Sequence, residues 1–274
     1  MKKVILSLFV LVAIAIQANA ATWVAANRVS TVGSQLLTKN GISAKITFKV
    51  VDGVADNSEA VTKKIVQISS NDLSFAGNDN EVAAVVAHEL GHIICCHTDK
   101  AKVRSLAVAS LADKLGADNT LVEAANSSYA TSRVSAKEEQ EADIMGANLM
   151  IAANYNPLAM VVWITKQPGS TIDILKSRPA NADRAMDVYD FLIYNYSSKV
   201  KAGYACNEYK TFLVYANPIV SARNSNKKKL AKFNQEQEKA KKQRQQDLAN
   251  YKTNGGLNSW GVTYDMLMNK DSEK

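Results

Sequence analysis

The pentad His88-Glu89-Leu90-Gly91-His92 constrains this chain more than any other feature of its sequence. A helix turns once every 3.6 residues, so residues four apart lie on one face and their two imidazoles can bind the same zinc ion. The glutamate between them projects beside that ion. The preceding residues favour a helix, because Asn78 and Glu81 form a capping-box pattern and apolar residues recur after them. The sequence therefore predicts a largely buried helix that carries a metal site.

Zinc in a hydrolase takes three protein ligands and leaves one position for water, so a third ligand must lie elsewhere in the chain. His97 is the only other histidine. It lies nine residues after His88, on the opposite side of a continuous helix, and we do not expect it to be the ligand. Cys96 follows His92 by one turn and is another alternative, but a small core residue is the favoured interpretation.

The segment from Ser135 to Asp143 contains better candidates for the third ligand. It opens with a capping-box pattern and continues as a helix through about residue 153. On this helix Glu139 and Asp143 lie four residues apart on one face, whereas Glu138 and Glu141 lie on another. Two carboxylates among small and apolar residues are costly to bury unless positive charge compensates both. Zinc and its histidine ligands would provide that charge.

These two segments together resemble the soluble periplasmic relatives of the HtpX and CAAX-prenyl-protease zinc metalloendopeptidases. Two further motifs extend the resemblance over roughly residues 30 to 195. Asn154-Tyr155-Asn156-Pro157 is similar to the Gly-Tyr-Asp-Pro turn of that family, and Ser177-Arg178-Pro179 with Arg184 is similar to its Ser-His-Pro…Arg motif. The pentad and the second segment are specific when they occur together.

The resemblance implies that His88, His92 and Glu139 bind one zinc ion per chain. It also implies that Glu89 is the general base of peptide hydrolysis. Asp143, one helical turn beyond Glu139, is placed to accept the free ring N–H of a liganding histidine and so fix its orientation. The alternative for Asp143 is a solvated carboxylate on the helix surface.

Arg178 departs from the family pattern, because relatives often have histidine at this position. A guanidinium can neither bind zinc nor transfer a proton near neutral pH, so these roles of the family histidine do not carry over. Arg178 stays a candidate, with Arg184, for contact with the transition state or with the metal ligands. Arg184 keeps the second basic position and can donate hydrogen bonds to a carboxylate or to the developing oxyanion. For both arginines the alternative is a surface position in a polar loop.

The amino terminus predicts export to a bacterial periplasm. Lys2 and Lys3 precede an apolar run over residues 4–16, and small residues at 18–20 form a cleavage site, as in a secretory signal peptide. We predict cleavage after Ala20. The apolar run is too short to span a bilayer, and we expect no transmembrane segment in the mature chain. In an oxidising compartment Cys206 could pair with Cys95 or Cys96.

We expect an α+β fold that is mostly helical, with a zincin-like metalloprotease domain over residues 21–222. Residues 45–51 and 64–69 are predicted strands of a small sheet beside the pentad helix. The resemblance implies that the strand before this helix can pair with an extended substrate backbone. Residues 117–134, which are largely small and polar, are predicted to cover the site.

Residues 223–274 are predicted to form a basic, helical and exposed tail. Residues 223–252 contain ten Lys or Arg against three acids, a net +7 that equals the formal charge of the whole chain. A solvated basic helix is the simplest interpretation, and attraction to an anionic envelope surface or an acidic partner is the alternative. We expect no nucleic acid partner for an exported chain.

Taken together, these patterns predict an exported zinc metalloendopeptidase with unfolded or misassembled polypeptides as substrates, the latter implied by the resemblance. One alternative is a chaperone-like zinc protein that binds assembling envelope proteins with little proteolysis. Another is a zinc amidase that acts on cell-wall peptides. The presence of Glu89 favours hydrolysis, because a structural zinc site would fill the open position and require no base.

Overall fold

The computed structural model describes residues 23–42, 45–53, 55–57, 60–95, 97, 136–168 and 180–254. These residues are mostly helical with one small sheet, which confirms the predicted α+β class. The predicted signal peptide, the predicted cover over residues 117–134, Cys96 and Arg178 lie outside the described residues.

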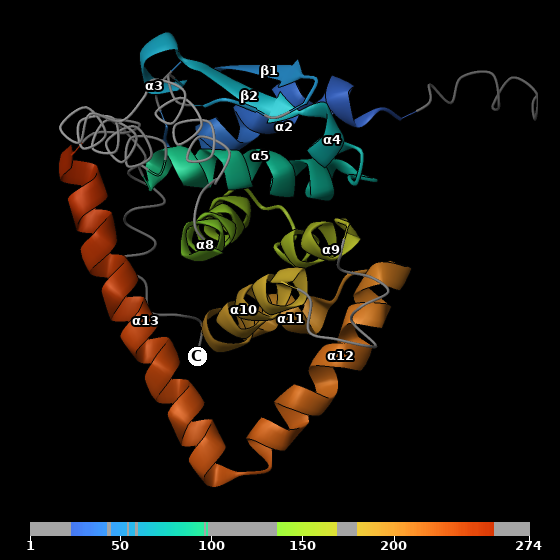
Figure 1. Ribbon diagram of the computed structural model, residues 1–274, viewed down its shortest axis with the longest axis vertical. Coiled ribbons are helices and arrows are strands. Elements are labelled where there is room, and N and C mark those ends of the chain that lie inside the picture. Colours follow the sequence, from blue (N-terminus) through green and yellow to red (C-terminus); the bar gives the residue numbers. More distant parts are fainter. Residues whose placement is uncertain are drawn as a thin grey trace, which may run out of the picture.

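The elements are stacked in layers from a small sheet at one end to two long helices at the other (Figure 1). The sheet consists of β1 and β2, which are parallel and in register from Thr47 opposite Ile65 to Val51 opposite Ser69. Both predicted strands are therefore confirmed. The bounds are α2 (Ala25–Lys39), β1 (Thr47–Val51), α3 (Ala60–Lys63), β2 (Ile65–Ser69), α4 (Ser70–Leu73), α5 (Asp79–Ile94), α8 (Ala136–Ala152), α9 (Leu158–Lys166), α10 (Ala180–Asn195), α11 (Ser197–Ala202), α12 (Asn207–Asn224) and α13 (Lys227–Asn254).

Helix α5, which carries the pentad, lies between the sheet and the helices α8 and α9 (Figure 1). Thirteen of its 16 residues are buried, as expected for a helix that is covered on all sides. The predicted cap is confirmed, because the side-chain oxygen of Asn78 accepts the N–H groups of Asn80 and Glu81 at 3.0 and 3.2 Å. The side chain of Glu81 is buried in an ion pair with Lys166 of α9 at 2.6 Å. The pentad is thus held on a fixed central helix.

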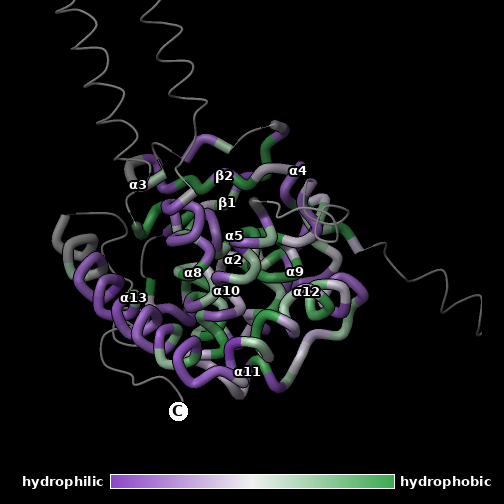
Figure 2. Tube along the Cα trace, turned by 60° about the horizontal axis from the view of Figure 1, so that its bottom comes forward, coloured by the Kyte–Doolittle hydropathy of each residue, from purple (hydrophilic) through white to green (hydrophobic). Residues whose placement is uncertain are grey.

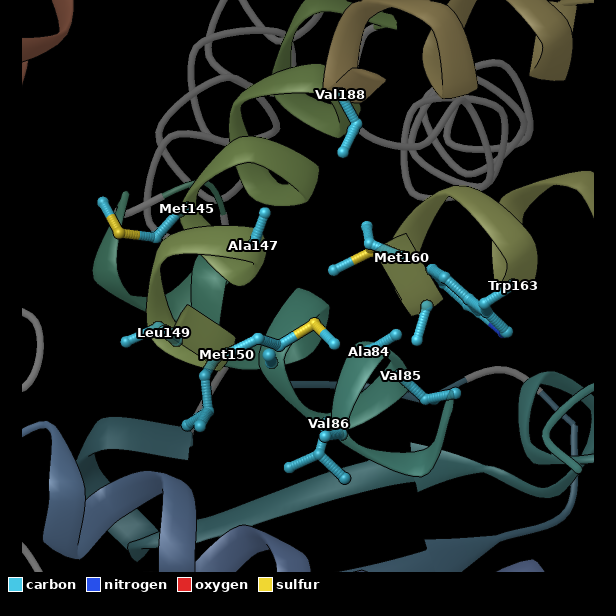
Figure 3. Close-up of a cluster of buried hydrophobic side chains, with 14 of the residues drawn as sticks. Ala84, Val85, Val86, Met145, Ala147, Leu149, Met150, Met160, Trp163 and Val188 are labelled. Carbon is cyan, nitrogen blue, oxygen red and sulfur yellow. The ribbon is translucent and has the colours of Figure 1, made fainter. Parts of the chain in front are cut away.

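Small residues allow α5 and α8 to cross closely enough for their polar side chains to meet. A Cβ atom on Gly91 would lie 2.6 Å from the carbonyl oxygen of Ala142, and one on Gly146 would lie 3.1 Å from the backbone of Ala87. A larger residue at Gly91 would push backbone aside, and one at Gly146 would require the Met160 side chain and the backbone of Ala87 to shift. Figure 3 shows the apolar side chains that pack around this crossing, among them Ala84 and Val85 of α5, Ala147 and Met150 of α8, Met160 and Trp163 of α9, and Val188 of α10.

The motif over residues 154–157 forms the turn between α8 and α9. Asn154 has φ of 63°, in the left-handed region that glycine favours and that asparagine tolerates better than most residues. The N–H of Tyr155 donates to the carbonyl of Met150 at 2.9 Å and closes the end of α8. The N–H of Asn156 donates to the side chain of Asn80 at 2.8 Å. The turn therefore fixes α8 relative to the start of α5.

Helices α12 and α13 form a V at the end of the molecule opposite the sheet (Figure 1). The predicted start of the tail at residue 223 falls inside α12, and Arg223 is not exposed. Its guanidinium pairs with Asp190 of α10 at 2.8 Å and lies 3.6 Å from the ring centroid of Phe233 in α13. The ion pair joins residue 223, the predicted start of the tail, to α10 of the domain, and the cation–π contact holds α12 against α13. Most of the visible length of α13 is hydrophilic (Figure 2).

The cysteines and the lengths of the apolar helices bear on the predicted compartment. Cys95 and Cys206 do not form a disulfide with each other, and Cys96, the other predicted partner of Cys206, lies outside the described residues. The sulfur of Cys206 instead caps α12 and accepts the N–H of Tyr209 at 3.3 Å. Among the helices that the structure describes, none combines the length and the apolar character that crossing a membrane would require.

Candidate metal centre

The side chains of His88, His92 and Glu139 converge where α5 crosses α8. The Nε2 atoms of the two histidines are 3.0 Å apart. The carboxylate oxygens of Glu139 lie 3.6 Å from Nε2 of His88 and 3.5 Å from Nε2 of His92. An ion placed about 2 Å from all three groups fits a triangle of this size, which matches the usual Zn–N and Zn–O bond lengths. The three residues therefore fit a zinc ion by both chemistry and spacing, as a candidate metal-binding group.

Asp143 and Arg184 lie behind His88, with the Asp143 side chain fully buried and the Arg184 side chain 16% exposed. Oδ1 of Asp143 is 2.8 Å from Nδ1 of His88, and the Asp143 side chain is 0% exposed. The guanidinium of Arg184 donates to both oxygens of Asp143 at 2.8 Å and lies 3.1 Å from Glu139. Asp143 is thus not a solvated carboxylate, and Arg184 lies in α10 rather than in a surface loop.

This network controls the ionisation of the acidic groups. Burial by itself would raise the pKa of Asp143, but the hydrogen bond from His88 and the charge of Arg184 hold it below its usual range. Burial would also raise the pKa of Glu139, yet the hydrogen bond from His92 and the charges of His88 and Arg184 lower it to about 2. Both carboxylates are therefore ionised near neutral pH, as a cation site requires.

Glu89 projects from the pentad into the same cavity as the three candidate ligands. Its Oε2 accepts a hydrogen bond from the Asn57 side chain at 2.8 Å. The Asn57 amide also accepts the N–H of Gln67 at 2.7 Å and donates to its carbonyl at 3.0 Å, which ties the loop before α3 to β2. Burial raises the pKa of Glu89, and the charges of His88 and His92 with the Asn57 bond offset part of that rise. Sequence reasoning missed Asn57, which has no recognisable motif.

His97 is not one of the three converging side chains, but it contacts one of them. Its Nδ1 lies 3.0 Å from Nδ1 of His92, and its Nε2 lies 3.0 Å from Oε2 of Glu141. The helical wheel assigned His97 to the far side of α5, but α5 ends at Ile94, so the wheel does not apply at residue 97. The helix periodicity also predicted that Glu141 faces away from the site. In the structure Glu141 contacts His97, which in turn contacts the candidate ligand His92.

The metal-ligand triangle opens into a cavity of about 790 Å³. This volume lies within the usual range of ligand and substrate sites. The walls come from the loop before α3, from the end of β2 with α4, and from α5, α8, α9 and α10. The lining residues are Gly53, Ala55, Asn57, Ser69, Asn71, Asp72, His88, Glu89, His92, Glu139, Trp163, Gln167 and Arg184.

Comparison with known proteins agrees with this geometry. Residues 24–191 match the model of peptidase family M48. The metalloprotease LoiP of Escherichia coli (strain K12) is 24% identical over 178 residues, which cover 60% of this chain and 69% of that protein. No solved structure matches the chain. Because the family model spans more than half of the sequence, the chain belongs to peptidase family M48 and is a metalloprotease.

Proposed function

We propose that this chain is a zinc-dependent endopeptidase of the periplasm that hydrolyses unfolded or misassembled envelope proteins. One observation carries the catalytic part of the proposal. Glu89 lines the same cavity as the three residues of the candidate metal group. Two imidazoles and one carboxylate with a fourth position open to a cavity are typical of catalytic zinc. A structural zinc site would use a fourth protein ligand and would not require a base.

A bound zinc ion would lower the pKa of a water molecule and polarise the scissile carbonyl. Glu89 accepts the proton of the attacking water and passes it to the leaving amine. The burial that raises the pKa of Glu89 makes its carboxylate a stronger base. Because Asn57 binds Oε2 of Glu89, we assign Oε1 to the water.

Arg184 acts on the ligands rather than on the substrate. Sequence reasoning allowed it to bind either a carboxylate or the developing oxyanion. Its guanidinium already donates to both oxygens of Asp143 and lies against Glu139. We therefore propose that Arg184 holds these two carboxylates in place. Stabilisation of the developing oxyanion would then come from a bound metal ion.

The substrate class rests on the resemblance to periplasmic relatives and on the amino-terminal sequence pattern. An extended substrate was expected to pair with the strand before the pentad helix. At Gln67 of β2 both backbone groups are already bonded to the amide of Asn57. We propose that substrate pairs with β2 nearer its end at Ser69, which lines the cavity.

Cleavage of unfolded casein by wild type and by Glu89→Gln tests this proposal. Both proteins are purified from the periplasmic fraction, where mass spectrometry should place the first residue at Ala21. We expect normal zinc content in Glu89→Gln but a loss of cleavage of at least about a hundredfold, because an amide cannot accept the proton. His88→Ala is the control that should lose both zinc and cleavage.

The same experiment separates the alternatives. Equal cleavage by Glu89→Gln and wild type would show that another group is the base. A zinc-loaded wild type that binds unfolded casein without cutting it would favour the chaperone-like alternative. Cleavage of cell-wall peptides in place of casein would favour an amidase.

A further inference from the structure

A second histidine and a second carboxylate lie behind the Nδ1 atom of His92. His97 contacts this atom at 3.0 Å, and Glu141 contacts the other nitrogen of His97, also at 3.0 Å. His97 is 1% exposed, and its ring stands at 71° to the ring of His92. His92, His97 and Glu141 therefore form a series of two buried imidazoles and a partly exposed carboxylate, which ends at a candidate metal ligand.

The proton positions along this chain follow from the metal site. Nε2 of His92 faces Nε2 of His88 and the carboxylate of Glu139, so a metal there requires the Nε2 lone pair of His92. The proton of neutral His92 must then be on Nδ1, from which it is donated to Nδ1 of His97. His97 in turn carries its own proton on Nε2 and donates it to Glu141. With these proton positions, each of the two hydrogen bonds has one donor and one acceptor.

We propose that His97 and Glu141 are positioning residues that fix the tautomer and the ring orientation of His92 as a zinc ligand. This inference rests on the proposed zinc site. Groups that accept the free N–H of a liganding histidine raise its basicity and hold its ring, and their loss typically weakens metal binding 10- to 100-fold. Asp143 has the equivalent place behind His88.

The Glu141 carboxylate is held more closely by His97 than by Lys137. Lys137 lies 3.7 Å from it, but the Lys137 side chain is 76% exposed and such surface pairs contribute little. The contact with His97 is shorter and is made to a buried ring. Removal of Lys137 is therefore a matched control for removal of the carboxylate.

Zinc affinity of the mature chain, measured by competition with a chromophoric chelator, tests the proposal. We expect His97→Leu to weaken zinc binding by about 10- to 100-fold, because it keeps bulk but removes the acceptor. His97→Asn should restore most of the affinity, since its amide oxygen can accept from His92. Glu141→Leu should have a smaller effect than His97→Leu, and Lys137→Ala none. The visible spectrum of the cobalt-loaded protein should change in His97→Leu and return towards wild type in His97→Asn.

Several outcomes would overturn the inference. Unchanged affinity and cobalt spectrum in His97→Leu would do so directly. Equal losses in His97→Asn and His97→Leu would identify His97 as a ligand itself. If circular dichroism shows that His97→Leu is unfolded, wild-type affinity in Glu141→Leu would count against the proposal. Full zinc retention in His92→Ala would instead refute the zinc site of the proposed function, so the two failures are distinguishable.

Discussion

The two histidines of the pentad belong to one helix but are supported in different ways. The ring of His88 contacts Asp143 directly. The Asp143 side chain is 0% exposed and accepts hydrogen bonds from Nε and Nη2 of Arg184. His92 is backed by the ring of His97 and only then by Glu141, whose side chain is 21% exposed. The His88 side is thus an ion pair between α8 and α10, made by Asp143 and Arg184. The His92 side is a series of hydrogen bonds that ends at a partly solvated carboxylate.

This difference predicts unequal sensitivity of the two sides. A buried ion pair contributes little net stability, but removing one partner leaves an uncompensated charge in the interior. A carboxylate with access to water can be removed at lower cost, because solvent can take its place in the hydrogen bond. The His88 side therefore couples metal binding to folding, whereas the His92 side affects mainly the metal.

The largest expected effect is that of Asp143→Ala. Because Arg184 would lose its main partner, we expect the free energy of unfolding to fall by about 3–5 kcal/mol, measured by urea denaturation of the metal-free protein. Glu141→Ala deletes the matched carboxylate behind His92 and should cost about 1 kcal/mol. Equal losses of unfolding free energy in Asp143→Ala and Glu141→Ala would show that the two histidines are supported equally.

A smaller effect is expected for Gly91→Ala, which tests the helix crossing that both sides share. The new Cβ would meet the carbonyl oxygen of Ala142 at 2.6 Å, and backbone cannot move aside as a side chain can. We expect a loss of about 1–3 kcal/mol in thermal or urea unfolding, together with weaker zinc binding. Gly77→Ala is the control, because its Cβ would find only ordinary contacts from 3.4 Å outward. Wild-type zinc affinity in Gly91→Ala would show that the crossing need not be so close.

The smallest expected effect concerns Asp187 of α10, near the buried pair. Burial and the neighbouring charges of Asp183, Asp190 and Asp143 raise the pKa of Asp187 to about 6. Since this pKa lies above that of an unfolded aspartate, its contribution to stability is complete below about pH 4 and is lost as pH rises through about 6. Asp187→Asn should therefore gain stability over wild type between pH 4 and pH 7, by no more than about 1 kcal/mol after screening by solvent.

Unfolding curves of both proteins at several pH values measure this difference. Asp247→Asn on α13 removes one negative charge outside this group of aspartates and is the control. A constant difference between Asp187→Asn and wild type at all pH values would argue against charge crowding on the His88 side.

Patterns that are local in sequence were predicted correctly. The cap at Asn78, the strands before α5 and the helix that begins near residue 136 depend on neighbouring residues and on helix or strand periodicity, which can be read directly. The two histidines lie together because four residues are one helical turn. Glu139 and Asp143 share a face for the same reason, so both lie beside the pentad once α8 crosses α5.

Only the tertiary structure decided what supports these groups. Asn57 reaches Glu89 across 32 positions of sequence, Arg184 reaches Asp143 across 41 and His97 reaches Glu141 across 44. No periodicity links such residues, because their contacts depend on where a helix ends and on how closely two helices cross. The pentad by itself determined that the chain could hold a metal between two histidines. The close approach of α5 and α8 at Gly91 and Gly146 determined which side chains orient those histidines, because packing alone sets the distance between elements that the sequence separates.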